Sequence, residues 1–106
     1  MTRFLTLAGL CFAMGPWRTG QASWYHAKPA HVSMYGTRLL TASNEFRPGT
    51  RLVVTNGSRA VTVTVAGSGP VCRGRKLDLD RHAFRRLALP SRGVVRVKYR
   101  RLPPGR

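Results

Sequence analysis

The sequence predicts a small all-β domain with one short helix. Val61, Val63 and Val65 alternate with threonines, a period of two that is typical of strands. The pair Asn56-Gly57 separates this run from a second apolar run, which indicates a hairpin. Helical spacing of apolar side chains is confined to residues 81–88. The chain has 106 residues, which suits a single domain.

The N-terminal residues are similar to a secretory signal peptide. Arg3 precedes a short apolar run, residues 4–14, and the small residues Gly20 and Ala22 follow. This run is too short to span a bilayer, which needs about 20 apolar residues. We expect a signal peptide over residues 1–22, a folded domain over 23–100 and a basic tail over 101–106. The alternative is that the apolar run forms a buried first helix or strand.

Removal of a signal peptide would change the cysteine content and the location of the protein. Cleavage after residue 22 would remove Cys11 and leave Cys72 alone, so we expect no internal disulfide. It would also leave no transmembrane segment. We therefore expect the protein in the periplasm or cell envelope, as a monomer held together by its apolar core.

The first half of the folded part contains one clear strand pair. Residues 22–25 predict a short first strand. Residues 26–40 look like a loop because Pro29 and Gly36 interrupt them. The Pro48-Gly49 pair suits a type II turn. Residues 51–56 and 59–66 then form the predicted hairpin.

The second half alternates between strand and helix signals. In residues 75–80, Leu77 and Leu79 share one face, and Lys76, Asp78 and Asp80 share the other. Asp80 is a good cap for a helix whose apolar residues are Ala83, Phe84, Leu87 and Ala88 and which ends before Pro90. Residues 93–100 predict a last strand with Val95, Val97 and Tyr99 on one face.

The charge of the chain favours anionic partners. Nineteen Lys and Arg against three acids give a formal net charge of +16, which attracts polyanions. We find no recognised nucleic-acid motif, and the predicted export signal argues against nucleic acid as a partner. Peptidoglycan or another anionic wall polymer fits an exported cationic protein better. The three histidines have neither the spacing nor the neighbours of a metal site, so we expect no metal or cofactor.

Five segments, in order, carry a resemblance to a known family. They are "GQASWY" at 20–25, "LTAS" at 40–43, "PGTRLVVTN" at 48–56, "VTVTVAGSGPVCRGRKLDLDRHAF" at 61–84 and "GVVRVKY" at 93–99. Together they resemble the RlpA-like double-psi β-barrel family, which includes septal lytic transglycosylases and expansin-like domains. The resemblance implies a six-stranded double-psi barrel that is exported and acts on peptidoglycan glycan strands.

The resemblance also implies the site residues. Asp78 matches the acid that the family keeps in its substrate groove. The family's His is replaced by Asn44, and the acid of its Gly-Pro loop is replaced by Gly67. We expect Asp78 as the catalytic residue. The expected substrate-binding residues are Trp24, Tyr25, Asn44, Ser68, Gly69, Arg73 and Arg75. Of Trp24 and Tyr25, one should point to the core and the other outward.

The chemistry open to a single carboxylate is limited. Glycoside hydrolysis needs two carboxylates, and Glu45 lies on no matching motif. Lytic transglycosylation needs one residue, which protonates the leaving oxygen and then accepts a proton. The cations near Asp78 in sequence argue against this role, because opposite charges lower a carboxyl pKa. Asp78 therefore has three possible roles: catalytic acid, ligand-binding acid or partner in a structural ion pair.

Three functions remain open from the sequence. The first is an exported lytic transglycosylase. The second is a wall-binding module that has lost the family's catalytic acids. The third, which we favour least, is a basic nucleic-acid-binding barrel.

Overall fold

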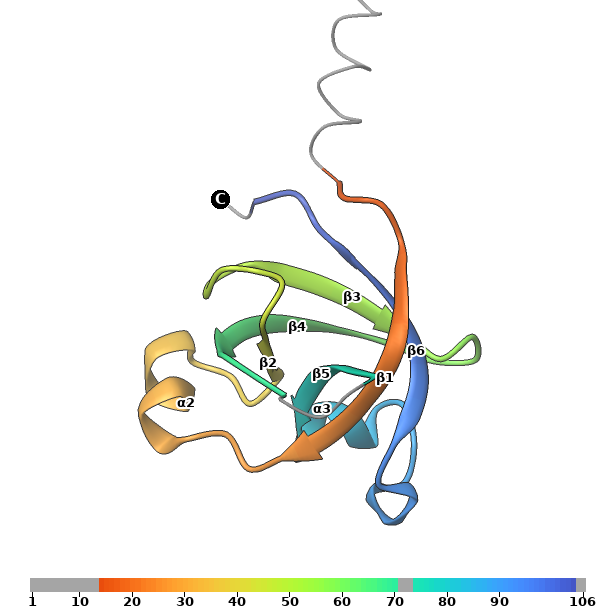
Figure 1. Ribbon diagram of the computed structural model, residues 1–106. Helices are drawn as coiled ribbons and strands as arrows, with labels where there is room; N and C mark the ends of the chain where they lie inside the picture. Colours follow the sequence, from red (N-terminus) through yellow and green to blue (C-terminus); the bar gives the residue numbers. More distant parts are fainter. Residues whose placement is uncertain (1–13, 71–73, 105–106) are drawn as a thin grey trace, which may run out of the picture.

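The computed structural model describes residues 14–70 and 74–104, and its six strands close into a barrel in the order β1-β5-β2-β4-β3-β6 (Figure 1). The strands are β1 (Arg18–Tyr25), β2 (Leu40–Ser43), β3 (Arg51–Thr55), β4 (Ala60–Gly67), β5 (Arg75–Asp80) and β6 (Val95–Arg101). Two pairs, β1 with β5 and β2 with β4, are parallel, and the other four are antiparallel. The expected fold class, a small six-stranded double-psi barrel, is confirmed.

The period-two patterns place one face of each strand inside the barrel. Val61, Val63 and Val65 of β4 are buried, as predicted. Leu77, Leu79 and the other buried side chains complete a core that also holds Tyr99 and Phe84, both with no exposed surface. Full burial of one such side chain stabilises the fold by about 1.5–3 kcal/mol.

The predicted turns are confirmed. The backbone N–H of Thr50 donates to the carbonyl of Arg47, and Gly49 takes a φ of 93°, as a type II turn requires. The hairpin between β3 and β4 pairs Thr55 with Ala60 around residues 56–59.

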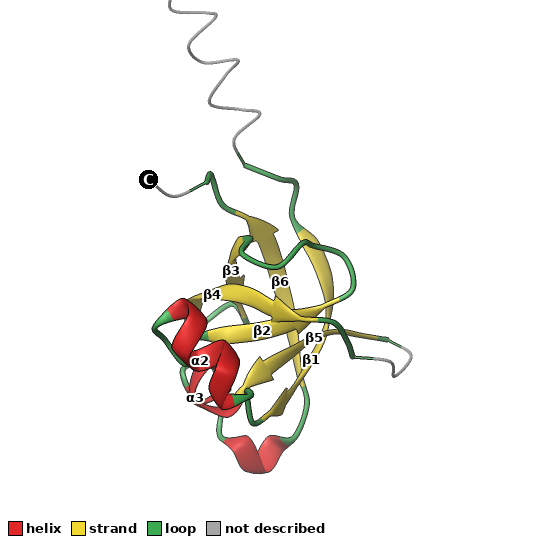
Figure 2. Cartoon of the chain, turned by 90° about the vertical axis from the view of Figure 1, so that its left-hand side faces the viewer, coloured by secondary structure: helices red, strands yellow, loops and turns green. Residues whose placement is uncertain are grey.

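Helix α3 (Arg81–Arg85) follows β5 directly, as predicted, but it ends at Arg85, and Leu87 and Ala88 lie in the turn after it. The side chain of Asp80 accepts a hydrogen bond from the backbone N–H of His82, which is the expected cap. Ala83 and Phe84 are buried against the barrel. A short 3₁₀ helix, η1 (Pro90–Arg92), then leads to β6. In Figure 2 the helices lie outside the ring of strands.

A second helix was not predicted. Residues 26–40, expected as a loop, contain α2 (Pro29–Tyr35). Pro29 lies in the first turn, where a helix tolerates proline. Gly36 caps the other end with a φ of 66°, a left-handed conformation that suits glycine. The two residues taken as breakers are therefore the ends of the helix.

Strand β1 is longer than predicted. It begins at Arg18, and residues 18–22 pair with β6 (Figure 1). The strand thus crosses the expected boundary between leader and folded domain. Residues 1–13, which carry most of the signal-like sequence, lie outside the described residues. No helix in the described part of the chain is long and apolar enough to cross a membrane.

The expected tail is attached to the barrel at its start. Arg101 is the last residue of β6. The backbone N–H of Leu102 donates to the carbonyl of Arg51, and the guanidinium of Arg51 donates to the carbonyl of Pro103.

Candidate functional site

Four positions on neighbouring strands form one row on the outer face of the barrel. Strand β5 lies between β1 and β2, and Asp78 is paired with Ser23 on one side and Ala42 on the other. Ala42 is in turn paired with Gly67 of β4. The neighbours of Asp78 in the chain, Leu77 and Leu79, point into the core. The row Ser23–Asp78–Ala42–Gly67 therefore carries one carboxylate among short side chains.

Asp78 is half-buried and has one hydrogen-bond donor among the described side chains. The Ser23 hydroxyl donates to its Oδ1 at 3.0 Å. Burial raises the pKa of Asp78, while the Ser23 hydrogen bond and the charge of Arg75 lower it; burial is the larger effect. At a given pH the Asp78 carboxyl therefore keeps its proton more often than an ordinary aspartic acid does.

This result overturns the sequence-based expectation that nearby cations would lower the pKa of Asp78. Two of those cations are directed elsewhere. The Arg81 guanidinium lies over the Trp24 ring, 5.7 Å from its centroid. The Lys76 side chain packs against Gly20. Of the expected basic neighbours, Arg75 acts on the carboxyl, and Arg73 lies outside the described residues.

Tyr25 is the aromatic residue on the Asp78 face. It lies two residues beyond Ser23, on the same side of β1. Burial raises the pKa of Tyr25, and the charges of Asp78 and Asp80 raise it further, which places the phenol close to both carboxylates.

Trp24 points the other way, as the prediction of one inward and one outward ring requires. It packs against the main core, and its Nε1–H donates to the carbonyl of Pro90 at 2.8 Å. This contact connects β1 to the segment before β6. The Trp24 ring therefore lies on the opposite side of β1 from Ser23 and Tyr25.

Asn44 holds the Gly-Pro loop beside the row. Its Oδ1 accepts from the backbone N–H of Gly69 at 2.7 Å, and its Nδ2 donates to the carbonyl of Pro70 at 2.8 Å. A Cβ on Gly69 would lie 4.0 Å from the Cβ of Ala42, so the loop passes close to the row. Ser68 in the same loop is exposed. Of the expected substrate-binding residues, Asn44 thus has an evident positioning role, with both ends of its amide engaged.

Asp80 has a different environment, although it is two residues from Asp78. It is 1% exposed. Its Oδ1 accepts from the backbone N–H of Ala27 at 2.9 Å. Its Oδ2 accepts from the backbone N–H of His82 at 2.9 Å and lies 3.0 Å from His82 Nδ1. These contacts fix the start of α3 and the chain after β1, so Asp80 is a structural residue.

Glu45 also makes contacts within the protein through both of its carboxylate oxygens. One carboxylate oxygen pairs with the Arg18 guanidinium at 3.2 Å, and the other accepts the hydroxyl of Tyr99. Burial and this carboxylate raise the pKa of Tyr99. Arg18 also lies over the Phe46 ring, 4.9 Å from its centroid. Both carboxylate oxygens of Glu45 thus have a partner within the protein, Arg18 for one and Tyr99 for the other.

His31 is the residue that sequence reasoning missed. From the sequence we expected no role for it beyond that of a polar side chain outside any metal site. It is half-buried on α2, and its Nδ1 is buried without a hydrogen-bond partner among the described residues. Its Cε1 would lie 3.5 Å from a Cβ on Gly67. The ring therefore covers the Gly67 end of the row. No local pattern could have shown this, because α2 itself was not predicted.

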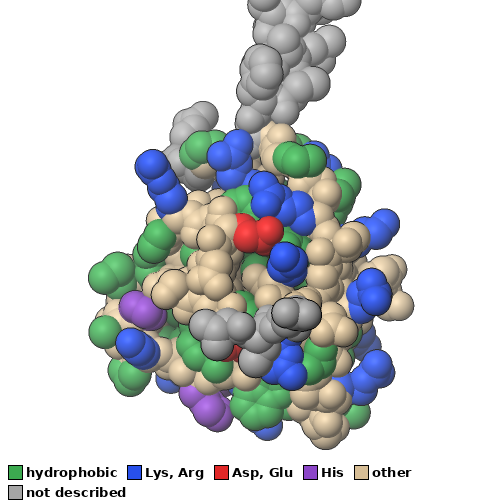
Figure 3. Space-filling view, viewed as in Figure 1, with side chains coloured by type: hydrophobic (Ala, Val, Ile, Leu, Met, Phe, Trp, Pro, Cys, Tyr) green, Lys and Arg blue, Asp and Glu red, His purple; other side chains and the backbone are tan. Residues whose placement is uncertain are grey.

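The face of the barrel seen in Figure 3 is strongly basic. Figure 3 shows blue side chains of Lys and Arg spread over this face, with red carboxylates confined to small patches. Asp78 lines none of five pockets found among the described residues. It is half-buried, and Ser23 and Ala42 beside it are 7% and 4% exposed. Among the residues described, no group of three or more His, Cys, Asp or Glu could hold a metal ion.

Solved structures share this barrel. Expansin from Clavibacter michiganensis matches without ligand at a TM-score of 0.69 and 25% identity, over 86% of this chain and 52% of that one. A mutant of the same expansin in complex with cellohexaose matches at 0.68 and 25%, over 86% and 54% of the two chains. The Streptomyces papain inhibitor matches at 0.66 and 23%, over 84% and 96%, and shares the fold alone.

Comparison of sequences places the chain beside the RlpA proteins. The chain is 36% identical over 94 residues to the endolytic peptidoglycan transglycosylase RlpA of Pasteurella multocida, which covers 81% of this chain and 32% of that protein. It is 33% identical over 96 residues to RlpA of Rickettsia felis, covering 80% and 42%. The chain thus spans less than half the length of these curated relatives. The family model described as lytic transglycolase matches residues 18–99. That match covers all six strands up to Tyr99, and the chain belongs to the RlpA-like double-psi β-barrel family.

Proposed function

We propose that this chain is an exported cell-wall protein that cleaves peptidoglycan glycan strands by lytic transglycosylation, with Asp78 as the acid. One observation carries this proposal. Of the three carboxylates in the chain, Asp78 is the one whose pKa is raised by burial while part of it remains exposed. Glu45 and Asp80 are held by structural contacts. The RlpA relatives support glycan strands as the substrate.

The reaction needs one proton donor. The protonated Asp78 carboxyl donates its proton to the glycosidic oxygen as the bond from C1 to that oxygen breaks. The 6-hydroxyl of the same muramic residue attacks C1 and gives its proton to the Asp78 carboxylate. The products are a 1,6-anhydromuramic end and a new hydroxyl end, and the carboxyl returns to its acid form. No water is consumed, so a second carboxylate that activates water is unnecessary.

The second candidate function is a wall-binding module without catalysis. It is favoured by the composition of the row, in which Asp78 is accompanied by Ser23, Ala42 and Gly67 and by no second acid. In this reading Asp78 and Tyr25 bind sugar hydroxyls, and the basic surface supplies charge attraction.

The test compares the wild type with Asp78→Asn on intact and on peptide-free peptidoglycan. We expect the wild type to release fragments with 1,6-anhydromuramic ends, and Asp78→Asn to lose about 10²–10⁴-fold in rate, the usual contribution of general acid catalysis. Pelleting of both proteins with the wall, without release by either, would replace the enzyme with the binding module.

Export of the protein remains part of the proposal. Cleavage after residue 22 would remove the half of β1 that pairs with β6. We therefore propose that processing occurs before Arg18, which leaves the barrel intact. Mass spectrometry of the protein from the cell envelope tests this. A mature N-terminus at residue 23 would contradict it.

A further inference from the structure

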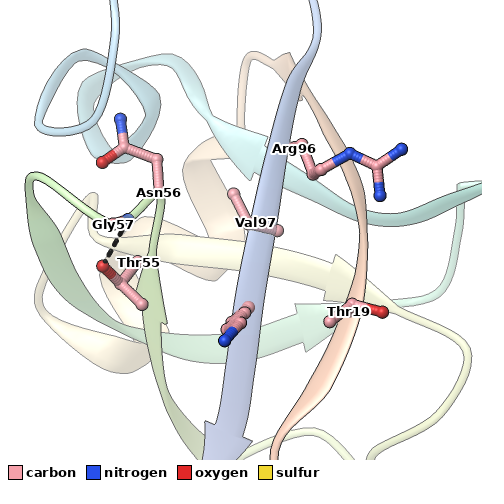
Figure 4. A pocket seen from close by; sticks show the side chains of 7 residues that line it. Thr19, Thr55, Asn56, Gly57, Arg96 and Val97 are labelled. Atoms are coloured by element: carbon pink, nitrogen blue, oxygen red, sulfur yellow. Dashed lines mark hydrogen bonds between the residues drawn. The ribbon is translucent and has the colours of Figure 1, made fainter.

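A pocket of about 420 Å³ lies on the outer face of the barrel, away from Asp78 (Figure 4). It is formed by β1, β6, the end of β3 and the hairpin turn after it. Its lining residues are Thr19, Thr55, Asn56, Gly57, Arg96, Val97 and Lys98. In Figure 4, β6 runs through the middle, with Thr19 on one side and Thr55, Asn56 and Gly57 on the other.

The strand register places the polar groups in order. Lys98 is paired with Thr19 of β1 and with Thr55 of β3. A threonine therefore lies beside Lys98 on each neighbouring strand. Arg96 lies two residues before Lys98 on the same face, about 7 Å away along the strand. The buried Val97 lies between these two cations in the chain.

One wall of the pocket is fixed before any ligand binds. The Asn56 side chain donates to the carbonyl of Leu87 and accepts from the backbone N–H groups of Ser58 and Arg59. The Thr55 hydroxyl donates to the carbonyl of Arg59 and accepts from the backbone N–H of Gly57. The hairpin turn is therefore a rigid rim.

The two cations have no acid to neutralise them. The chain has three acids. Glu45 pairs with Arg18, Asp80 contacts His82, and Asp78 lies in the row on β5. Arg96 and Lys98 are exposed on the strand. An Arg and a Lys on the same face of β6, both lining one pocket, are side chains that bind oxyanions.

Strand β1 connects this pocket to Asp78. Thr19 and Ser23 lie four residues apart on the same face of β1, about 13 Å of strand. A polymer that places one sugar at Asp78 and runs along this face of β1 would reach Arg96 and Lys98. In a peptide-free glycan strand the charged group available there is the lactyl carboxylate of muramic acid.

We propose that the pocket of Thr19, Arg96 and Lys98 is a carboxylate-binding subsite, which holds a muramic carboxylate of the strand whose bond lies at Asp78. The identity of the ligand rests on the proposed function. The subsite gives the barrel a preference for charged glycans over neutral ones, and this preference weakens with salt because both cations are exposed.

Binding in an Asp78→Asn background tests the subsite without any turnover. The probes are peptide-free glycan strands and the same strands with their carboxylates amidated. We expect the free strands to bind about tenfold more tightly, as the loss of charge-assisted contacts predicts. Adding Arg96→Gln and Lys98→Gln should abolish this preference. The matched control is Arg85→Gln with Arg86→Gln, at the end of α3. It removes the same charge outside the pocket and should preserve the preference.

Two results would overturn the subsite. One is a preference that survives the Arg96 and Lys98 substitutions. The other is an equal loss in the control, which would show attraction by net charge alone. Because the test measures binding, its result is independent of whether the protein cleaves glycan. A protein that releases no anhydromuramic ends can still prefer charged strands, and an enzyme that cleaves them can lack this preference.

Discussion

Asp78 and Asp80 lie two residues apart on β5 and show how differently one barrel can treat two carboxylates. Asp80 is almost fully buried, and the backbone N–H groups of Ala27 and His82 donate to it. Asp78 is half-buried and accepts from the Ser23 hydroxyl. Two backbone donors and almost complete burial make Asp80 a structural anchor. Burial with a single donor leaves Asp78 able to hold and release a proton.

The comparison predicts opposite effects on stability. Asp80→Ala removes the helix cap, worth about 1 kcal/mol, and leaves the buried N–H of Ala27 unpaired, at about 1–3 kcal/mol. We expect a total loss of about 2–4 kcal/mol in the free energy of unfolding, measured with denaturant.

Asp78→Asn is the matched control for that measurement. Its raised pKa means that the folded protein binds the Asp78 proton more tightly than the unfolded chain does. The ionised carboxylate therefore opposes folding once the pH rises above the unfolded pKa of about 3.9. At neutral pH Asp78→Asn should be at least as stable as the wild type, with the difference vanishing in acid. Equal losses for Asp78→Asn and Asp80→Ala would contradict the assignment of different roles.

Ser23→Ala sharpens the comparison by removing the one side-chain donor to Asp78. The hydrogen bond stabilises the carboxylate, so its loss should raise the pKa of Asp78 further. If the acid form is required, the rate of anhydromuramic release declines as pH rises through this pKa. The alkaline limb of the pH–rate profile should then move to higher pH. Ser91→Ala, at an exposed position of η1, is the control. A shift of the limb to lower pH in Ser23→Ala would refute the electrostatic account.

The smallest expected effect concerns Tyr25. Burial is the main cause of its raised pKa, and the charge of Asp78 is the next. Asp78→Asn should therefore lower the pKa of the Tyr25 phenol part of the way back toward 10, the ordinary value. NMR of the tyrosine rings measures this. No change in Tyr25 would mean that the phenol does not face the row.

Local sequence patterns predicted those features that depend on near neighbours in the chain. The hairpin around Asn56-Gly57, the inward leucines of β5 and the Asp80 cap each follow from a pattern within ten residues. The family resemblance added the barrel closure, which pairs strands far apart in sequence.

The features that the sequence did not predict depend on distant contacts. The first half of β1 is a strand because β6 pairs with it, about 75 residues later in the chain. Helix α2 is held by packing of Val32 and Tyr35 on Ala27, Leu40 and Ala66 rather than by a strong local signal. The direction of the Asp78 pKa shift also could not follow from sequence spacing, because Arg81 and Lys76 turn to Trp24 and Gly20.

The protonation of Asp78 is the central claim, and a titration of carboxyl carbons by NMR tests it most directly. With three acidic side chains in the chain, Asp78→Asn identifies its signal by difference. We predict a midpoint for Asp78 above the ordinary aspartate value of about 3.9. A midpoint at or below that value would show that Arg75 and Ser23 outweigh burial, and Asp78 would then be a bound anion rather than a proton donor.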